Sequence, residues 1–220
     1  ALTPDQRRLA RAWNGEGGLL ETLSDLVEVD RAAALAVISV ESSGEPFAPD
    51  GRMTIRFENH RFFKDWGKDH SDVFQDHFQF DPDKPWKAHR FRAAAADPFA
   101  PFHGDQSREW TVFEFARALH EAAAMRSISM GLAQIMGFNH PRLGYDSVRE
   151  MFDRFQSSLR FQILGLFDFV KGSGATSPLL EALQRRRFDQ FATLYNGPGQ
   201  TAEYASRLDH HCTLATALLP

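Results

Sequence analysis

One stretch decides the fold of this chain, and it reads Ala32-Ala33-Ala34-Leu35-Ala36-Val37-Ile38-Ser39-Val40-Glu41. A run this apolar indicates an element that is buried on all sides. It ends in an ionisable residue, Glu41, which Ser42-Ser43-Gly44 follows. Burial disfavours the charged form of a carboxyl group and raises its pKa, so Glu41 is a candidate general acid that keeps its proton near neutral pH. The alternative interpretation of Glu41 is a solvated residue at a helix end.

Length and composition indicate an ordinary globular protein. The 220 residues suit a single domain over residues 1–220. A net charge of -4 and a pI of about 6.1 argue against a nucleic-acid partner, because such proteins carry a basic face. The single cysteine, Cys212, excludes an internal disulfide and a cysteine-cluster metal site.

The chain offers no signal for a membrane. No apolar stretch has membrane-spanning length, so we expect a soluble protein without membrane insertion. Residues 1–8 are polar and lack the apolar core of a secretory signal. We therefore expect synthesis in the cytoplasm without a recognisable Sec signal in this chain.

Periodicity predicts a mainly α (α+β) fold. Helices are predicted over residues 4–13, 19–28, 31–42, 110–126, 146–170, 177–194 and 200–218, with a break at Gly15–Gly18 and a short helix opening at Gly131–Met136. Residues 53–58 alternate apolar with polar and predict a short strand, the start of one small hairpin or sheet after the buried helix. Residues 60–78 are expected to be helical in part, and residues 79–107 to form an irregular binding loop or lid.

Three short segments carry the chemistry when they are taken together. They are Glu41-Ser42-Ser43-Gly44, Ser129-Met130-Gly131-Leu132-Ala133-Gln134-Ile135-Met136-Gly137 and Tyr195-Asn196-Gly197-Pro198-Gly199. Each alone is weak, because short glycine-containing turns are common. Their order and spacing are far less frequent by chance.

The trio resembles the goose-type lysozyme and lytic transglycosylase superfamily, with a Glu-Ser at the end of a buried helix, a Gly-Leu-x-Gln segment and a late Tyr-Asn. More closely, the chain resembles the N-acetylmuramidase family of phage endolysins and bacterial wall hydrolases. Further matches are Asp50-Gly51-Arg52, Phe57-Glu58-x-His60, Glu121-Ala122-Ala123 and Arg126-Ser127-x-Ser129. One departure is Met130, where the family usually has tryptophan, and we expect it to alter one wall of the cleft. The resemblance implies a lysozyme-like domain.

The resemblance and the chemistry of glycoside cleavage assign roles to the acidic residues. Cleavage needs an acid for the leaving oxygen and a means of stabilising or capturing an oxocarbenium-like centre. Glu41 is the predicted acid, and Asp50 and Glu58 are candidates for a second carboxylate. The alternatives are an ion pair of Glu58 with Arg56 or Arg61, and a turn-forming role for Asp50.

The same resemblance implies substrate-binding roles for Ser129, Gln134, Tyr195 and Asn196. Ser129 and Gln134 suit hydrogen bonds to an N-acetyl sugar or to Glu41. The alternatives are a helix cap and a buried amide whose hydrogen bonds are satisfied within the protein. Tyr195 resembles the family tyrosine that reaches toward the catalytic glutamate, with a core tyrosine as the alternative. Asn196 fits turn formation better.

We predict no cofactor and no metal. No His-Glu-x-x-His pair occurs, and the adjacent His210 and His211 would point about 100° apart on a helix. Ser42 and Ser43 lack the Gly-x-Ser-x-Gly context of a nucleophilic serine.

The predicted function is a peptidoglycan hydrolase, an N-acetylmuramidase that cleaves the β-1,4 bond between N-acetylmuramic acid and N-acetylglucosamine. A lytic transglycosylase that forms 1,6-anhydro ends is the first alternative, and a non-catalytic helical module that binds the cell wall is the second. The predicted substrate is the glycan strand of bacterial peptidoglycan, in the periplasm or outside the cell. Without an export signal, a holin or a secretion machine would deliver the enzyme, and an immunity protein would be a partner for its control.

Overall fold

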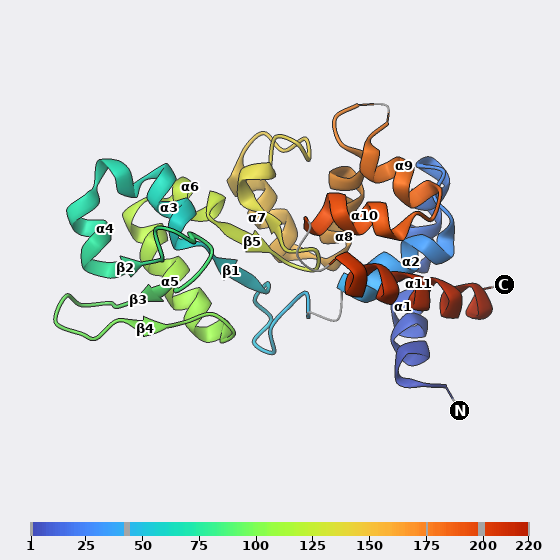
Figure 1. Cartoon of the computed structure of the whole chain (residues 1–220), viewed down its shortest axis with the longest axis horizontal. Helices are drawn as coiled ribbons and strands as arrows, with labels where there is room; N and C mark the ends of the chain where they lie inside the picture. The colour runs from blue at the N-terminus through green and yellow to red at the C-terminus, as the bar shows by residue number, and fades with distance from the viewer. Residues whose placement is uncertain (1, 42–44, 175, 198–200, 220) are drawn as a thin grey trace. The chain divides into compact units, whose positions relative to one another are not determined.

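The computed structural model describes residues 2–41, 45–174, 176–197 and 201–219, which are mostly helical (Figure 1). The chain forms two compact units. We call residues 1–44 with 160–220 the terminal unit, and residues 45–159 the central unit. The single domain over residues 1–220 stays a prediction.

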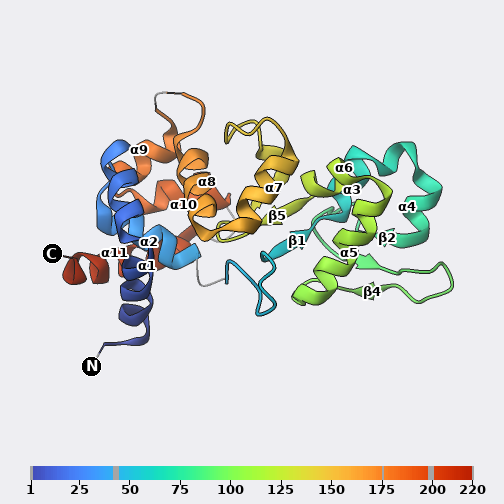
Figure 2. The ribbon, with the colours of Figure 1, turned by 180° about the vertical axis from the view of Figure 1, so that it is seen from behind.

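The terminal unit is built around the apolar run that opened the sequence analysis. Its described helices are α1 (Pro4–Leu26), α2 (Arg31–Glu41), α8 (Leu159–Lys171), α9 (Pro178–Gln184), α10 (Phe188–Asn196) and α11 (Thr201–Leu218). The predicted start of α2 is confirmed, because the Asp30 carboxylate accepts hydrogen bonds from the N–H groups of Ala32 and Ala33 at 3.0 and 3.1 Å. Every residue from Ala32 to Val40 is buried, and α1 and α11 pack against α2 (Figure 2).

The predicted break at Gly15–Gly18 is wrong, since α1 continues through it to Leu26. Thr3 and Gln6 form a reciprocal capping box that starts the helix. Each of the three glycines costs about 1 kcal/mol relative to alanine, and the complete burial of Leu9 and Leu20, at about 1.5–3 kcal/mol each, offsets their sum.

Three other predicted helices are each divided in two. The segment 110–126 is interrupted at His120, which is extended (φ -160°). The segment 146–170 is interrupted at Ser158, which is extended (φ -165°) because a short polar side chain favours non-helical backbone. The segment 177–194 is interrupted after Gln184, and Arg186 there has a left-handed φ of 50°. The predicted last helix is confirmed as α11.

The central unit holds two small antiparallel sheets, β1-β5-β6 and β2-β3-β4 (Figure 1). Its elements are β1 (Ile55–Phe57), α3 (Asn59–Asp65), the 3-10 helix η1 (Gly67–Asp69), α4 (Ser71–His77), β2 (Phe78–Gln79), β3 (Arg90–Phe91), β4 (Ala100–Pro101), α5 (Gln106–Leu119), α6 (Glu121–Arg126), β5 (Ile128–Met130), β6 (Ile135–Met136), the 3-10 helix η2 (Gly137–Asn139) and α7 (Val148–Ser157).

The strands correct two predictions. The helix expected at Gly131–Met136 is the turn and second strand of the β5–β6 hairpin, and Gly131 and Gln134 turn it with φ values of 63° and 47°. The stretch 79–107, predicted to be irregular, contributes β3 and β4, so a second small sheet exists beside the predicted one. Strands of two or three residues show too little alternation to be recognised in a sequence.

Aromatic side chains form the core of the central unit. The Phe62 ring lies 5.7, 5.0 and 5.4 Å from those of Phe57, Trp66 and Phe78, so these rings pack against one another. Met130 was expected at a cleft wall, but its side chain is fully buried, so its replacement of tryptophan changes core packing instead.

Candidate active site

Glu41 is the last residue of α2 and is partly buried. The Tyr204 hydroxyl of α11 donates a hydrogen bond to Glu41 Oε1, and the Tyr195 hydroxyl of α10 also hydrogen-bonds to this carboxyl. The two phenol rings stack with their centroids 6.0 Å apart and their planes 17° apart. The buried helix therefore presents its carboxyl group to a pair of phenols.

The protonation of Glu41 follows from a balance of opposing effects. Burial raises its pKa above the usual value, while the Tyr204 hydroxyl, the Arg207 guanidinium and the Tyr195 hydroxyl each lower it, and burial prevails. Burial and the nearby Glu41 carboxyl also raise the pKa of both tyrosines, so both stay protonated donors. The arrangement yields an acid that can hold its proton closer to neutral pH than a solvated glutamate.

Tyr195 and Asn196 occupy different surroundings although they are neighbours in sequence. The Tyr195 ring stacks on Phe191 at 5.4 Å and meets Phe169 edge-on at 6.0 Å, so it is a packed tyrosine that also reaches Glu41. Asn196 is exposed at the end of α10, where Gly197 takes a left-handed φ of 74°. Ser42, Ser43, Gly44, Pro198 and Gly199 of the sequence motifs lie outside the described residues.

Sequence reasoning missed Tyr204 and Arg207. Arg207 donates a hydrogen bond to the Val40 carbonyl at 3.3 Å and lowers the pKa of Glu41. The two residues are three positions apart on α11, and this spacing puts them on one helix face. Polar residues occupy both buried and exposed positions along α11, so this pair carried no distinctive signal in the sequence.

Asp50 lies in the central unit as a turn residue. Its exposed carboxylate accepts hydrogen bonds from the backbone N–H of Arg52 at 3.0 Å and from Arg52 Nε at 2.7 Å. The Arg52 side chain and backbone hold the pKa of Asp50 below its usual range. Gly51 has a φ of 81°, as the tight turn requires.

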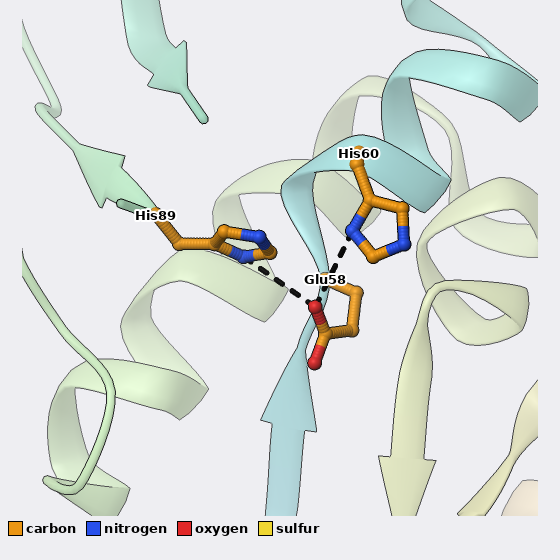
Figure 3. A group of neighbouring side chains, drawn as sticks. All are labelled: Glu58, His60 and His89. Carbon is orange, nitrogen blue, oxygen red and sulfur yellow. Dashed lines mark ion pairs between the residues drawn. The ribbon is translucent and has the colours of Figure 1, made fainter. Parts of the chain in front are cut away.

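Glu58 follows β1 and is surrounded by cationic or imidazole groups. Arg56 Nε donates to Glu58 Oε1 at 2.9 Å, and Oε2 lies 3.4 Å from His60 Nδ1 and 3.6 Å from His89 Nδ1 (Figure 3). Burial alone would raise the pKa of Glu58, but His60, His89 and Arg56 outweigh it and keep the pKa below the usual value. The ion pair with Arg56, which was the alternative interpretation of Glu58, is present, and the role as second catalytic carboxylate stays a prediction.

Ser129 and Gln134 bond to each other across the β5–β6 hairpin. Ser129 Oγ donates to Gln134 Oε1 at 2.7 Å, and Gln134 Nε2 donates to the Gly131 carbonyl at 2.8 Å. Ser129 is buried, whereas Gln134 is exposed overall. These bonds fix the turn, and a contact of either residue with a sugar stays a prediction.

Comparison with known proteins agrees with the predicted family. Residues 30–215 match the N-acetylmuramidase family. Among solved structures, the chain is similar to the endolysin of the Burkholderia phage AP3, with a TM-score of 0.71 and 28% sequence identity over 90% of this chain and 70% of that one. Comparison with curated proteins finds no match.

The fold and the family together define a glycoside hydrolase of the lysozyme type. The chain belongs to the N-acetylmuramidase family and is a peptidoglycan hydrolase, so it acts on the cell wall. The predicted family, fold class and enzyme class are thereby confirmed. None of the described helices combines the length and the apolar character that crossing a membrane requires.

Proposed function

We propose that this enzyme cleaves the β-1,4 bond between N-acetylmuramic acid and N-acetylglucosamine with Glu41 as the general acid. The observation that carries the proposal is the Glu41 carboxyl at the end of a buried helix, with its pKa raised by burial and with two tyrosine hydroxyls bonded to it. Glu41 donates its proton to the glycosidic oxygen as the bond to the leaving sugar breaks. The phenols then stabilise the carboxylate that remains.

The two tyrosines give Glu41 a second property that an acid needs. A proton donor must also tolerate its own charged form, because the proton leaves during the step. Hydrogen bonds from Tyr195 and Tyr204 strengthen when Glu41 becomes a carboxylate, since bonds to a charged acceptor are about twice as strong as neutral ones. Arg207 adds an attractive charge.

The fate of the cleaved sugar separates two mechanisms. In the hydrolase, a water attacks the sugar with the help of a second carboxylate, for which Asp50 and Glu58 are the candidates. In a lytic transglycosylase, Glu41 acts first as acid and then as base, and the muramic 6-hydroxyl closes a 1,6-anhydro ring. The described partners of Glu41 are two phenols and a guanidinium. This supports the lytic transglycosylase, which uses a single carboxyl group, as the second candidate.

One experiment tests both parts of the proposal. Purified wall is digested, and the products are analysed by mass spectrometry, with Glu41→Gln in parallel. Reducing muramic ends support the hydrolase, and 1,6-anhydro ends support the transglycosylase. Turnover by Glu41→Gln at the wild-type rate would overturn Glu41 as the acid in either mechanism.

Contacts with the substrate are proposed for Ser129, Gln134 and Asn196. Ser129 and Gln134 lie in the family segment, and an exposed amide can bond to an N-acetyl group. Asn196 is exposed beside Tyr195. A rise in KM with unchanged kcat on replacement of Gln134 or Asn196 by alanine would support a binding role.

The similarity to a phage endolysin supports release of phage as the biological role, and delivery as a toxin is the alternative. We propose that a holin or a secretion machine brings the enzyme to the wall, and that a toxin version would have an immunity protein. Expression inside bacteria with and without a holin tests this, because lysis only with the holin supports the delivery step. Lysis without it would contradict a need for a holin.

A further inference from the structure

Three side chains of the central unit point one ligand atom each toward a common point. Glu58 Oε2 lies 3.4 Å from His60 Nδ1 and 3.6 Å from His89 Nδ1, and one ligand atom from each of the three residues falls within 4.8 Å of the others. Figure 3 shows both imidazole rings turning a nitrogen toward the same carboxylate oxygen. The residues come from the end of β1, the first turn of α3 and the residue before β3.

The contacts of His89 fix which of its nitrogens is available. His89 Nε2 lies 2.8 Å from the Pro85 carbonyl oxygen, which can only accept, so Nε2 carries the hydrogen. In the neutral ring, Nδ1 then presents a lone pair on the side that faces Glu58 Oε2. Two electron-rich atoms at 3.6 Å attract a cation between them. A backbone carbonyl on the far nitrogen is also the usual outer partner of a metal-binding histidine.

The other two ligand atoms are buried and unsatisfied. Glu58 Oε2 and His60 Nδ1 have no hydrogen-bond partner among the described residues, although both are shielded from solvent. A buried polar atom without a partner costs about 1–3 kcal/mol by itself. The third ligand atom, His89 Nδ1, accepts a hydrogen bond from the Asn59 N–H at 3.4 Å. This bond is long, so it competes only weakly with a metal ion for the nitrogen lone pair.

Contrary to the expectation of no metal from the sequence, we propose that Glu58, His60 and His89 bind a divalent transition-metal ion, with Zn²⁺ as the best fit. Two imidazole nitrogens and one carboxylate oxygen are ligands that Zn²⁺ takes at about 2.0–2.2 Å, which separates neighbouring ligand atoms by about 3.3–3.6 Å in a tetrahedron. The two distances from Glu58 Oε2 agree with that geometry. Three protein ligands leave the fourth position of a tetrahedral zinc site for a water molecule.

The ion would join the two sheets of the central unit. Glu58 and His60 follow β1 of the first sheet, and His89 precedes β3 of the second. Such short strands supply few ladder hydrogen bonds, so a bond between them through a metal adds stability to this unit. A carboxylate that is bonded to a metal is not free to act as a catalytic base, so this inference opposes the candidate role of Glu58 as the second carboxylate.

The test uses the full chain without a polyhistidine tag, stripped with a chelator and titrated with Zn²⁺. We expect one ion bound per chain by calorimetry, and a rise in Tm of about 5–10 °C at a free Zn²⁺ concentration 100-fold above Kd. Glu58→Gln and His60→Ala should each weaken binding by at least about 100-fold, because loss of an outer partner alone costs 10- to 100-fold. The exposed His210→Ala in the terminal unit is the matched control and should bind like the wild type.

The Co²⁺-loaded wild-type protein keeps the proposal testable if a variant fails to fold. Four-coordinate Co²⁺ with imidazole ligands absorbs strongly in the visible range, whereas hydrated Co²⁺ absorbs weakly. Absence of both the spectrum and Zn²⁺ binding would overturn the site. Equal binding by the wild type and His60→Ala would overturn it as well.

Discussion

Glu41 of the terminal unit and Glu58 of the central unit are both partly buried carboxyl groups, yet their pKa values move in opposite directions. Burial raises the pKa in both. The partners of Glu41 are two neutral phenols and one guanidinium, and burial prevails. The partners of Glu58 are two imidazoles and a guanidinium, and they prevail over burial. Protonation is therefore set by what surrounds a buried carboxyl group and not by burial alone.

The largest expected effect is the loss of kcat when Glu41 is replaced. Glu41→Gln should lower kcat about 10²- to 10⁴-fold, the usual contribution of a general acid. The matched control is Glu181→Gln, an exposed glutamate of α9, which should keep kcat within about twofold. Release of soluble muropeptides from purified wall measures both. A loss confined to KM would contradict the acid role.

A smaller effect is expected when the Tyr204 hydroxyl is removed. Tyr204→Phe removes a donor that lowers the pKa of Glu41, so that pKa rises. The loss of activity with rising pH, which follows ionisation of the acid, should then move up by about one to two pH units, since a hydrogen bond to a charged group contributes about 1.5–3 kcal/mol.

The control for this shift is Tyr145→Phe, the third tyrosine, which lies in the central unit and meets Phe155 at 6.2 Å. Its profile of kcat against pH should match the wild type. A downward shift for Tyr204→Phe would show that the phenol stabilises the protonated carboxyl instead.

The stability of the two glutamine variants should depend on pH with opposite sign. Because folding raises the pKa of Glu41, this carboxyl group contributes stability that is complete below its pKa in the unfolded chain, about 4.3. That stability is lost as pH rises through its pKa in the folded protein. Glu41 therefore contributes less stability at pH 7 than at pH 4, and Glu41→Gln should raise Tm relative to the wild type at pH 7 but not at pH 4.

The lowered pKa of folded Glu58 gives stability that is present above about pH 4.3 and is lost as pH falls through the folded pKa. Glu58→Gln should therefore lower the free energy of unfolding at pH 7 by about 1–3 kcal/mol, and the difference should vanish at acid pH. Thermal unfolding with a chelator present measures both variants. The same sign for both at pH 7 would break the contrast between the two carboxyl groups.

The smallest expected effect is in the β5–β6 hairpin. Gln134→Ala removes the bonds to Ser129 Oγ and the Gly131 carbonyl and leaves alanine at a positive φ, which should cost about 1–2 kcal/mol of unfolding free energy. Ser129→Ala is the paired control, because it removes only the shared bond. A rise in KM for Gln134→Ala alone would assign a substrate contact to the exposed amide, and unchanged kinetics would leave the hairpin role.

Particular segments show how far sequence reasoning reached. The apolar run 32–40 identified α2 and its cap Asp30, because a long buried helix leaves an unmistakable composition. The hairpin at Ile128–Met136 was mistaken for a helix, because β6 has only two residues and its turn depends on positive φ values at Gly131 and Gln134. Tyr195 was anticipated beside Glu41, whereas Tyr204 was not, since no local pattern marks a tyrosine on a helix that returns to α2.

The sequence by itself determined the family, the mainly helical class and the carboxyl group that carries the proposed chemistry, because these depend on composition and short-range order along the chain. Only the tertiary structure decided which groups surround each carboxyl. Tyr204 comes to Glu41 from a distant helix, and His89 comes to Glu58 across another sheet. Electrostatic and hydrogen-bond energies depend on separation in space, and long-range folding sets that separation independently of distance along the chain.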